Sequence, residues 1–292
     1  MKTLTRIPQA LLSLLLAAAA IVMLVPIGLT FTNSLMTEQE MRSNYHLIGQ
    51  MTDTALGGQQ QFVNLKLIPD WLSWTQYAQV LILAPKFLRM FWNSAALVVP
   101  IIVGQTAVAT LAAYAFAKLR FPGREKLFMI YIMTMLMPFQ VTLVPNYLVV
   151  NKLGLMNSDP AIILPGIFGA FGVFMMRQFM AHIPGAYVEA AKMDGAGHWV
   201  IFTRIILPLV QPGLAALTVL LFVDNWNMIE QPLIFLQDTV KQPLSLYLAQ
   251  IDQEARGIGF AASALYMTPM ILLFLYAESY FIEGIQLSGI KG

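Results

Sequence analysis

The sequence contains no cysteine and few charged residues. Without cysteine the chain can form no disulfide, no thiolate metal site and no cysteine nucleophile. Asp, Glu, Lys and Arg make up 11% of the 292 residues, against about 25% in soluble proteins, and 58% are hydrophobic. The net charge is only +2. These values exclude a disordered chain, argue against nucleic-acid binding, and indicate a protein that crosses a membrane several times.

Several catalytic motifs are also missing. The sequence has no phosphate-binding loop of the form G-x-x-x-x-G-K-[ST], no H-E-x-x-H and no G-x-S-x-G. The three histidines, His46, His182 and His198, lack the spacing of metal ligands, and we expect them at the surface. We therefore expect a chain that is not an enzyme and that holds no metal or cofactor of its own.

Six long runs contain no Asp, Glu, Lys or Arg, and each can hold one membrane helix, which needs roughly 20 apolar residues. The sequence thus predicts an all-α membrane protein of six transmembrane helices in a single domain, residues 1–292. The glycines Gly166, Gly169 and Gly172 recur every third residue and indicate close helix packing. The predicted spans cover approximately residues 9–32, 91–117, 127–149, 160–178, 205–226 and 260–281.

Positive charges predict the orientation, because Lys and Arg gather in cytoplasmic loops. The segments 118–126 and 177–204 are rich in Lys and Arg, so we place them in the cytoplasm. We expect the chain itself to lie in the inner membrane of a bacterial cell. Both termini are then cytoplasmic, including the tail 282–292. A loop at 34–88 lies outside, and its segment 71–85, which is too short and polar to span, is predicted to be an interfacial helix.

Three carboxylates, Asp224, Glu230 and Glu278, lie at the edges of the apolar runs. Carboxylates inside the membrane would indicate an autonomous ion-coupled secondary transporter, which is the alternative interpretation. That class also needs paired half-repeats and broken midplane helices, and the sequence shows neither. We interpret all three carboxylates as interfacial.

The cytoplasmic loop 183–204 is the most informative segment. Pro184 suits the first position of a helix, and the helix formers after it are stopped by Asp194 and Gly195, where glycine tolerates a left-handed backbone. Pro208 and Pro212 should kink the membrane helix that follows. A short rigid helix between two spans suits insertion into a cleft of a partner, although an amphipathic loop lying on the membrane would share part of this pattern.

The loop resembles the coupling loop of permease subunits of binding-protein-dependent ABC importers. That signature reads E-A-A-x-x-x-G, nine residues and then I-x-L-P, and the spacing is intact here. The resemblance implies the type I ABC importer permease fold, with a coupling helix that contacts an ATPase. The coupling residues it implies are Glu189, Ala190, Ala191, Asp194, Gly195 and Pro208.

Further segments resemble the sugar-importing branch, the family of the maltose permease's second subunit. They are 113–128, 140–158 and the tail from Tyr280 to Gly292, in which the resemblance implies that Ser288, Gly289 and Lys291 contact the ATPase. Asn225, Trp226 and Asn227 offer the amides and ring that sugars require and are the candidate solute path. Three features depart from the family: a long 46–68 segment, the tail stretch Leu287–Ile290, and Asp224.

The resemblance also implies partners. They are a second homologous permease subunit, an ABC ATPase dimer that binds ATP and magnesium, an extracytoplasmic solute-binding protein, membrane lipid, and a carbohydrate substrate, with an oligosaccharide favoured. In this interpretation the chain forms half of a heterodimeric translocation pore.

Overall fold

The computed structural model describes residues 9–45, 66–251 and 256–289, and all regular secondary structure within these ranges is helical. Helices are required because a backbone in hydrocarbon must satisfy its own hydrogen bonds. Four helices are long and apolar enough to cross a membrane, and two bent helix pairs raise the number to six if each pair is one span. The predicted all-α membrane class is confirmed. The four are Leu11–Asn33, Pro85–Lys118, Pro160–His182 and Gly257–Tyr280.

The chain divides into two compact units. The first comprises Met1–Leu88 and Leu248–Met267, and the second comprises Arg89–Tyr247 and Thr268–Gly292. Helices α4 (Pro85–Lys118) and α15 (Arg256–Gly289) contribute residues to both units. The sequence, which shows no linker between domains, did not indicate this division.

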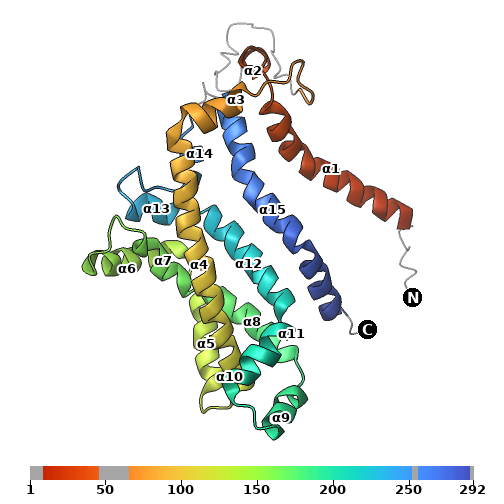
Figure 1. Cartoon of the computed structure of the whole chain (residues 1–292), viewed down its shortest axis with the longest axis vertical. Helices are drawn as coiled ribbons and strands as arrows, with labels where there is room; N and C mark the ends of the chain where they lie inside the picture. Colours follow the sequence, from red (N-terminus) through yellow and green to blue (C-terminus); the bar gives the residue numbers. More distant parts are fainter. Residues whose placement is uncertain (1–8, 46–65, 252–255, 290–292) are drawn as a thin grey trace, which may run out of the picture. The chain divides into compact units, whose positions relative to one another are not determined.

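The first unit contains α1 (Gln9–Asn33), α2 (Glu38–Tyr45) and two short elements before α4 (Figure 1). Those short elements are α3 (Thr75–Ala78) and the π-helix η2 (Gln79–Leu83), which fall in the segment predicted to be interfacial. Trp71 and Trp74 just before them are 76% and 70% exposed, as expected of aromatic side chains at headgroup level.

The first unit has a small core of its own. Met36, Met41 and Tyr45 are buried, and the Tyr45 ring lies 6.0 Å from that of Phe260 on α15. The hydroxyl of Tyr45 accepts a hydrogen bond of 2.6 Å from Nδ2 of Asn33. The end of α1 is thereby fixed to α2.

A charged cluster holds the segment after residue 65 against α2. The buried Glu40 accepts hydrogen bonds at Oε1 from the backbone N–H of Asp70 (2.8 Å) and from Nζ of Lys66 (3.1 Å). Lys66 also pairs with Asp70. The hydrogen bonds to Asp70 and Glu40 raise the pKa of Lys66, because both carboxylates favour its charged form.

The second unit carries the remaining helices (Figure 1). Their bounds are α5 Arg124–Met135, α6 Phe139–Lys152, α7 Pro160–Ile167, α8 Ala170–His182, α9 Gly185–Met193, α10 His198–Ile201, the π-helix η3 Phe202–Ile206, α11 Leu207–Leu209, α12 Gln211–Trp226, α13 Glu230–Phe235 and α14 Leu244–Ala249, whose last residues belong to the first unit. Helix α8 packs against α5 and α12, and α7 packs against α13.

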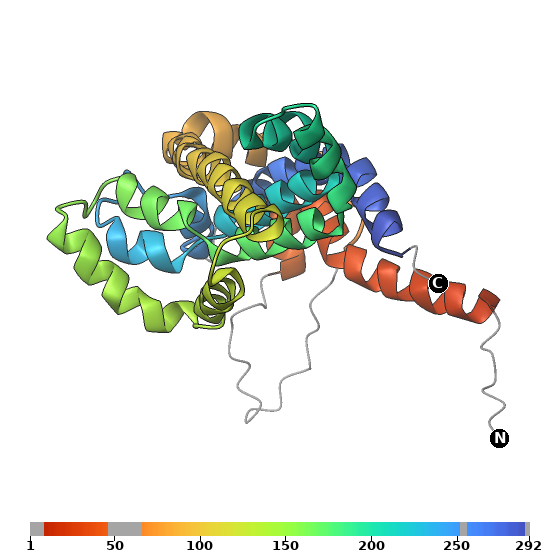
Figure 2. The ribbon, with the colours of Figure 1, turned by 90° about the horizontal axis from the view of Figure 1, so that it is seen from below.

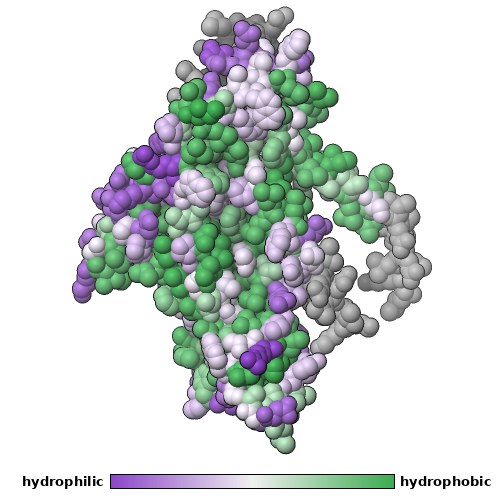
Figure 3. Space-filling model, in the orientation of Figure 1, coloured by the Kyte–Doolittle hydropathy of each residue, from purple (hydrophilic) through white to green (hydrophobic). Residues whose placement is uncertain are grey.

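The core of the second unit lies where α4, α6, α7 and α13 meet. Leu97 and Ile101 of α4 pack with Ala161 and Ile162 of α7 and with Phe235 of α13, and all five are at most 1% exposed. Many other apolar side chains face outward, as on α5, whose Met129, Ile130 and Met133 are exposed. Figure 3 shows hydrophobic side chains over much of the visible surface, as expected of helices surrounded by lipid.

Two of the apolar runs are bent. Helices α11 and α12 meet at 75°, with Pro208 in the first turn of α11 and Pro212 in the first turn of α12, so the predicted kink is confirmed. Helices α5 and α6 meet at 99° across Pro138, and Figure 2 shows α5 nearly end-on while α6 lies along its length. A proline lacks the N–H that would continue the helix at each bend.

The packing expected of the glycine run is present at Gly172. A Cβ at this position would lie 3.0 Å from Cβ of Ala109 on α4 and 3.6 Å from the methyl groups of Leu217 on α12. Ala109 and Leu217 are themselves buried. Helix α8 therefore approaches both neighbours closely because this residue has no side chain.

We predict that Gly172→Val destabilises the protein by about 1–3 kcal/mol, because the branched side chain would force α8 away from α4. The measurement is the thermal unfolding midpoint of the purified protein in mild detergent. Gly28→Ala on α1 is the control, since nothing lies within 4 Å of the added Cβ there. Equal midpoints for the two variants would show that the close approach is unimportant.

Candidate functional site

The loop 183–204, which the sequence predicts to be cytoplasmic, contains a discrete helix, α9. It begins after Pro184 and ends where Gly195 adopts φ +79°. The N–H of Gly195 donates to the carbonyl of Lys192 (3.0 Å), and that of Ala196 to the carbonyl of Ala191 (2.9 Å). This pair of bonds is the Schellman motif, which needs a left-handed residue at the helix end. The stop predicted at Asp194 and Gly195 is confirmed.

Helix α9 buries one side and exposes the other. Val188 and Ala191 are buried at 8% and 7% exposure, whereas Tyr187 is 52% and Met193 is 88% exposed. Glu189, Ala190 and Asp194 are exposed as well. Glu189 and Lys192 lie three residues apart on this helix, a spacing that allows pairing, but they form no ion pair in the described part of the chain. The exposed side therefore presents apolar and charged groups to the surroundings.

Polar contacts fasten both ends of this loop to α4. Nζ of Lys118, the last residue of α4, donates to the carbonyl of Ile183 at 2.6 Å. The hydroxyl of Tyr114 lies 3.1 Å from Nδ1 of His198, and the Tyr114 ring packs 5.2 Å from that of Phe202. His198, expected at the surface, is exposed yet has this partner. A separation of 84 residues left no sequence signal for the contact.

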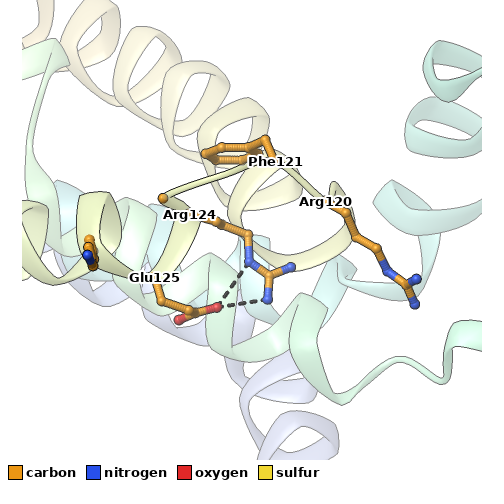
Figure 4. Close-up of a pocket in the computed structure, with 6 residues that line it drawn as sticks. Arg120, Phe121, Arg124 and Glu125 are labelled. Atoms are coloured by element: carbon orange, nitrogen blue, oxygen red, sulfur yellow. Dashed lines mark hydrogen bonds and ion pairs between the residues drawn. The ribbon is translucent and has the colours of Figure 1, made fainter.

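The turn between α4 and α5 is also held in place. Arg177 of α8 donates to Glu125 at 2.9 Å, donates to the carbonyl of Phe116, and lies 3.8 Å above the ring of Phe128. Arg124 pairs with the same carboxylate, as Figure 4 shows. Hydrogen bonds from charged donors, which are the stronger kind, thus connect α4, α5, α8 and Ile183, the residue that follows α8.

The candidate solute path divides into enclosed and exposed residues. Trp226 is 2% exposed, because its ring stacks on Phe222 at 5.1 Å and meets Phe91 edge-on at 5.6 Å. Asn225 is half-buried and donates to the carbonyl of Leu221. Asn227 is exposed, with Nδ2 donating to the carbonyl of Val223 at 2.7 Å. Within the chain, Asn227 is therefore more accessible than Trp226.

The three carboxylates at the run edges are all exposed. Glu230 accepts a hydrogen bond of 3.2 Å from Nε2 of Gln140, and Asp224 lies in the last turn of α12. The described residues hold no group of three His, Asp or Glu side chains placed to bind a metal ion.

The remaining residues predicted to contact an ATPase lie in other elements. Pro208 is exposed at the start of α11, Ser288 and Gly289 lie in α15, and Lys291 lies outside the described residues.

The arrangement is that of a permease: a bundle of apolar helices from which one short helix projects between two spans. A profile of the family described as binding-protein-dependent transport system inner membrane component matches residues 105–284. The chain belongs to this family. It is therefore a multi-pass component of the bacterial inner membrane, as the sequence predicted.

Individual relatives extend the match over most of the chain. An arabinooligosaccharide transport permease of Halalkalibacterium halodurans is 30% identical over 233 residues, which cover 79% of this chain and 84% of the relative. A sn-glycerol-3-phosphate transport permease of Brucella abortus is 27% identical over 284 residues, covering 93% and 94%. A Synechocystis permease for osmoprotective compounds is 33% identical, covering 69% and 70%.

A solved structure shares the fold. It is a chain of a bacterial ABC transporter involved in the import of the acidic polysaccharide alginate, with a TM-score of 0.75 and 23% identity. The match covers 96% of this chain and 99% of that one. The predicted importer permease fold is thereby confirmed.

We predict that Lys118→Met loosens the coupling loop. Loss of a hydrogen bond from a charged donor costs up to about 1.5–3 kcal/mol, so amides of residues 183–196 should exchange hydrogen roughly tenfold faster. Hydrogen exchange followed by mass spectrometry measures this, with the exposed Lys126→Met as the matched control. Unchanged exchange in Lys118→Met would show that the contact with Ile183 does not hold the loop.

Proposed function

We propose that this chain is one half of a heterodimeric pore in an ATP-driven importer of carbohydrate, with an oligosaccharide as substrate. Membership of the binding-protein-dependent family supports the importer. The substrate class is supported by the arabinooligosaccharide relative and by the alginate importer that shares the fold. The family also weighs against the alternative of an autonomous ion-coupled transporter.

The observation that carries the coupling role is the exposed side of α9. This helix lies between the candidate spans that end at His182 and begin at His198, and its Glu189 and Ala190 face outward. In the proposed complex it occupies a groove on an ATPase subunit that binds ATP and magnesium, while this chain catalyses nothing itself. A second permease subunit completes the pore, and a solute-binding protein delivers the substrate from outside.

The mechanism depends on unequal binding. A partner shifts a conformational equilibrium only as far as it binds the two conformations with different affinity. Lys118 and Tyr114 of α4 hold Ile183 and His198, the residues on either side of α9, and Arg177 joins α8 to α5. In the proposed mechanism a displacement of α9 is passed to these helices through those flanking residues. We assign Glu189 the polar contact with the ATPase and Gly195 the turn that keeps α9 short. Ser288, Gly289 and Lys291 are proposed as a second ATPase contact.

The solute path is proposed along the end of α12. The amide of Asn227 is exposed there, and amides supply both a donor and an acceptor for sugar hydroxyls. Trp226 supports this position from inside through its stacking on Phe222. Its enclosed ring contributes rigidity to the path, with Asn225 on the preceding turn.

We predict that Glu189→Ala and Gly195→Ala separate ATP hydrolysis from transport. A side chain at Gly195 costs about 1–2 kcal/mol in the left-handed conformation, so the turn that ends α9 should change. Membrane levels should stay normal, while uptake falls at least tenfold and ATPase recovery in pull-downs from mild detergent decreases.

Three matched variants serve as controls for the coupling test. Gly185→Ala adds the same methyl group to α9 in open space without a left-handed backbone, and Glu38→Ala removes an exposed carboxylate from α2. Gly195→Asn should recover much of the uptake, since asparagine tolerates the left-handed conformation. Normal uptake by both Glu189→Ala and Gly195→Ala would refute the proposed docking of α9.

The substrate class has its own test. Deleting the gene for this chain should abolish uptake of labelled oligosaccharide, and expression from a plasmid should restore it. Uptake of sn-glycerol-3-phosphate, the solute named for the Brucella relative, should be unaffected. Loss of glycerol phosphate uptake with normal oligosaccharide uptake would disprove the carbohydrate assignment and leave the importer assignment intact.

A further inference from the structure

A cleft of about 870 Å³ separates α9 from the end of α4 and the turn that follows it. Its size lies in the range of about 300–1,000 Å³ found for small-molecule sites. The proposed coupling role of α9 uses Glu189, which also lines the cleft, and leaves its basic residues unexplained. The charged and titratable side chains that line it are Lys118, Arg120, Arg124, Glu189, Lys192 and His198.

The cleft carries an excess of positive charge. Two arginines and two lysines line it together with a single carboxylate, Glu189. Arg124 is largely neutralised, because it pairs with Glu125 and donates to the carbonyl of Leu119. Lys118 donates one of its three N–H groups to the carbonyl of Ile183 and keeps two for other acceptors.

Two of the basic side chains in the cleft, those of Arg120 and Lys192, are available to bind a ligand. In the described part of the chain, the side chains of Arg120 and Lys192 form no hydrogen bond or ion pair with a protein group. Figure 4 shows the Arg120 side chain extending away from the Arg124–Glu125 pair. Arg120 belongs to the turn after α4 and Lys192 to the last turn of α9, so the two approach the cleft from opposite walls.

The position of the cleft points to the membrane surface. Lys118 is the last residue of one candidate span, and Arg124 is the first residue of the next. The ends of apolar helices lie at the depth of phospholipid headgroups. Basic pockets between membrane helices on the cytoplasmic side bind anionic headgroups, and the planar guanidinium of arginine matches a phosphate with two parallel hydrogen bonds.

We propose that this cleft binds a phosphate group, held between Arg120 and Lys192 with a further hydrogen bond from Lys118. An anionic phospholipid of the cytoplasmic leaflet supplies that phosphate from the membrane, and a soluble phosphate supplies the same chemistry from the cytoplasm. A phosphate held in this way bridges the coupling helix and the α4–α5 turn. It would therefore strengthen the connection between α9 and the membrane helices.

The test uses the full chain, purified with the subunits that accompany it, in nanodiscs of two compositions. One is phosphatidylcholine alone, and the other contains one quarter phosphatidylglycerol. Phosphatidylglycerol should raise the thermal unfolding midpoint of the wild type by several degrees. In the double variant Arg120→Gln/Lys192→Gln at least half of this rise should be lost, because two of the cations that line the cleft are removed.

Arg204→Gln is the matched control, since it removes an exposed arginine of the same cytoplasmic segment that does not line the cleft. It should keep the full rise. A separate arm adds inorganic phosphate to phosphatidylcholine nanodiscs, against chloride at equal ionic strength. A rise with phosphate that the double variant loses would support the site and identify a soluble source, whereas a rise with phosphatidylglycerol alone identifies the lipid.

Two results would overturn the proposal. The first is the absence of any rise with either phosphate source in the wild type. The second is an equal loss of the rise in Arg204→Gln and the double variant, which would mean that surface charge in general is responsible. Loss of partner subunits from the double variant, with no dependence on phosphate, would also overturn it and assign the cleft to a protein contact.

Discussion

The structure depends above all on the need of a backbone in hydrocarbon to satisfy its own hydrogen bonds. A chain with so few charges must place most of its length in the membrane, and there only continuous helices are available to it. The helices end or bend where the sequence interrupts that pattern, at Pro138, at Pro208 and Pro212, and at Gly169.

A second level of organisation comes from charged contacts at the ends of the helices. Arg177 joins α8 to both α4 and α5, and Lys118 joins α4 to the start of the coupling loop. Groups at this depth are partly removed from water, so their hydrogen bonds weigh more than those of a fully exposed surface. These contacts hold the ends of α4, α5 and α8 together beside the short exposed helix α9.

Local features of the sequence predicted more than long-range ones did. The extent of α9 and the turn at Gly195 follow from neighbouring residues, and so does the bend at Pro208 and Pro212. The apolar run after Lys126 suggested one continuous helix, and only Pro138 marks the place where the 99° bend occurs. Trp226 contacts Phe91, and Tyr114 contacts His198. The residues of each pair are far apart in the sequence, so no local sequence pattern could predict these contacts.

The first helix is exposed on all sides: none of the apolar window of α1 is buried within the chain. The exposure of α1 agrees with its sequence, because its own apolar side chains cover the whole circumference of the helix and leave no polar face. Solubility in hydrocarbon is then the main requirement on its side chains, and their shapes matter little. Leucine, isoleucine, valine and alanine should be largely interchangeable along α1, whereas the same exchanges around Gly172 are restricted by the neighbouring helices. The chain thus tolerates substitution differently in two places. Over evolution, the sequence of α1 should change faster than that of the helices packed around Gly172.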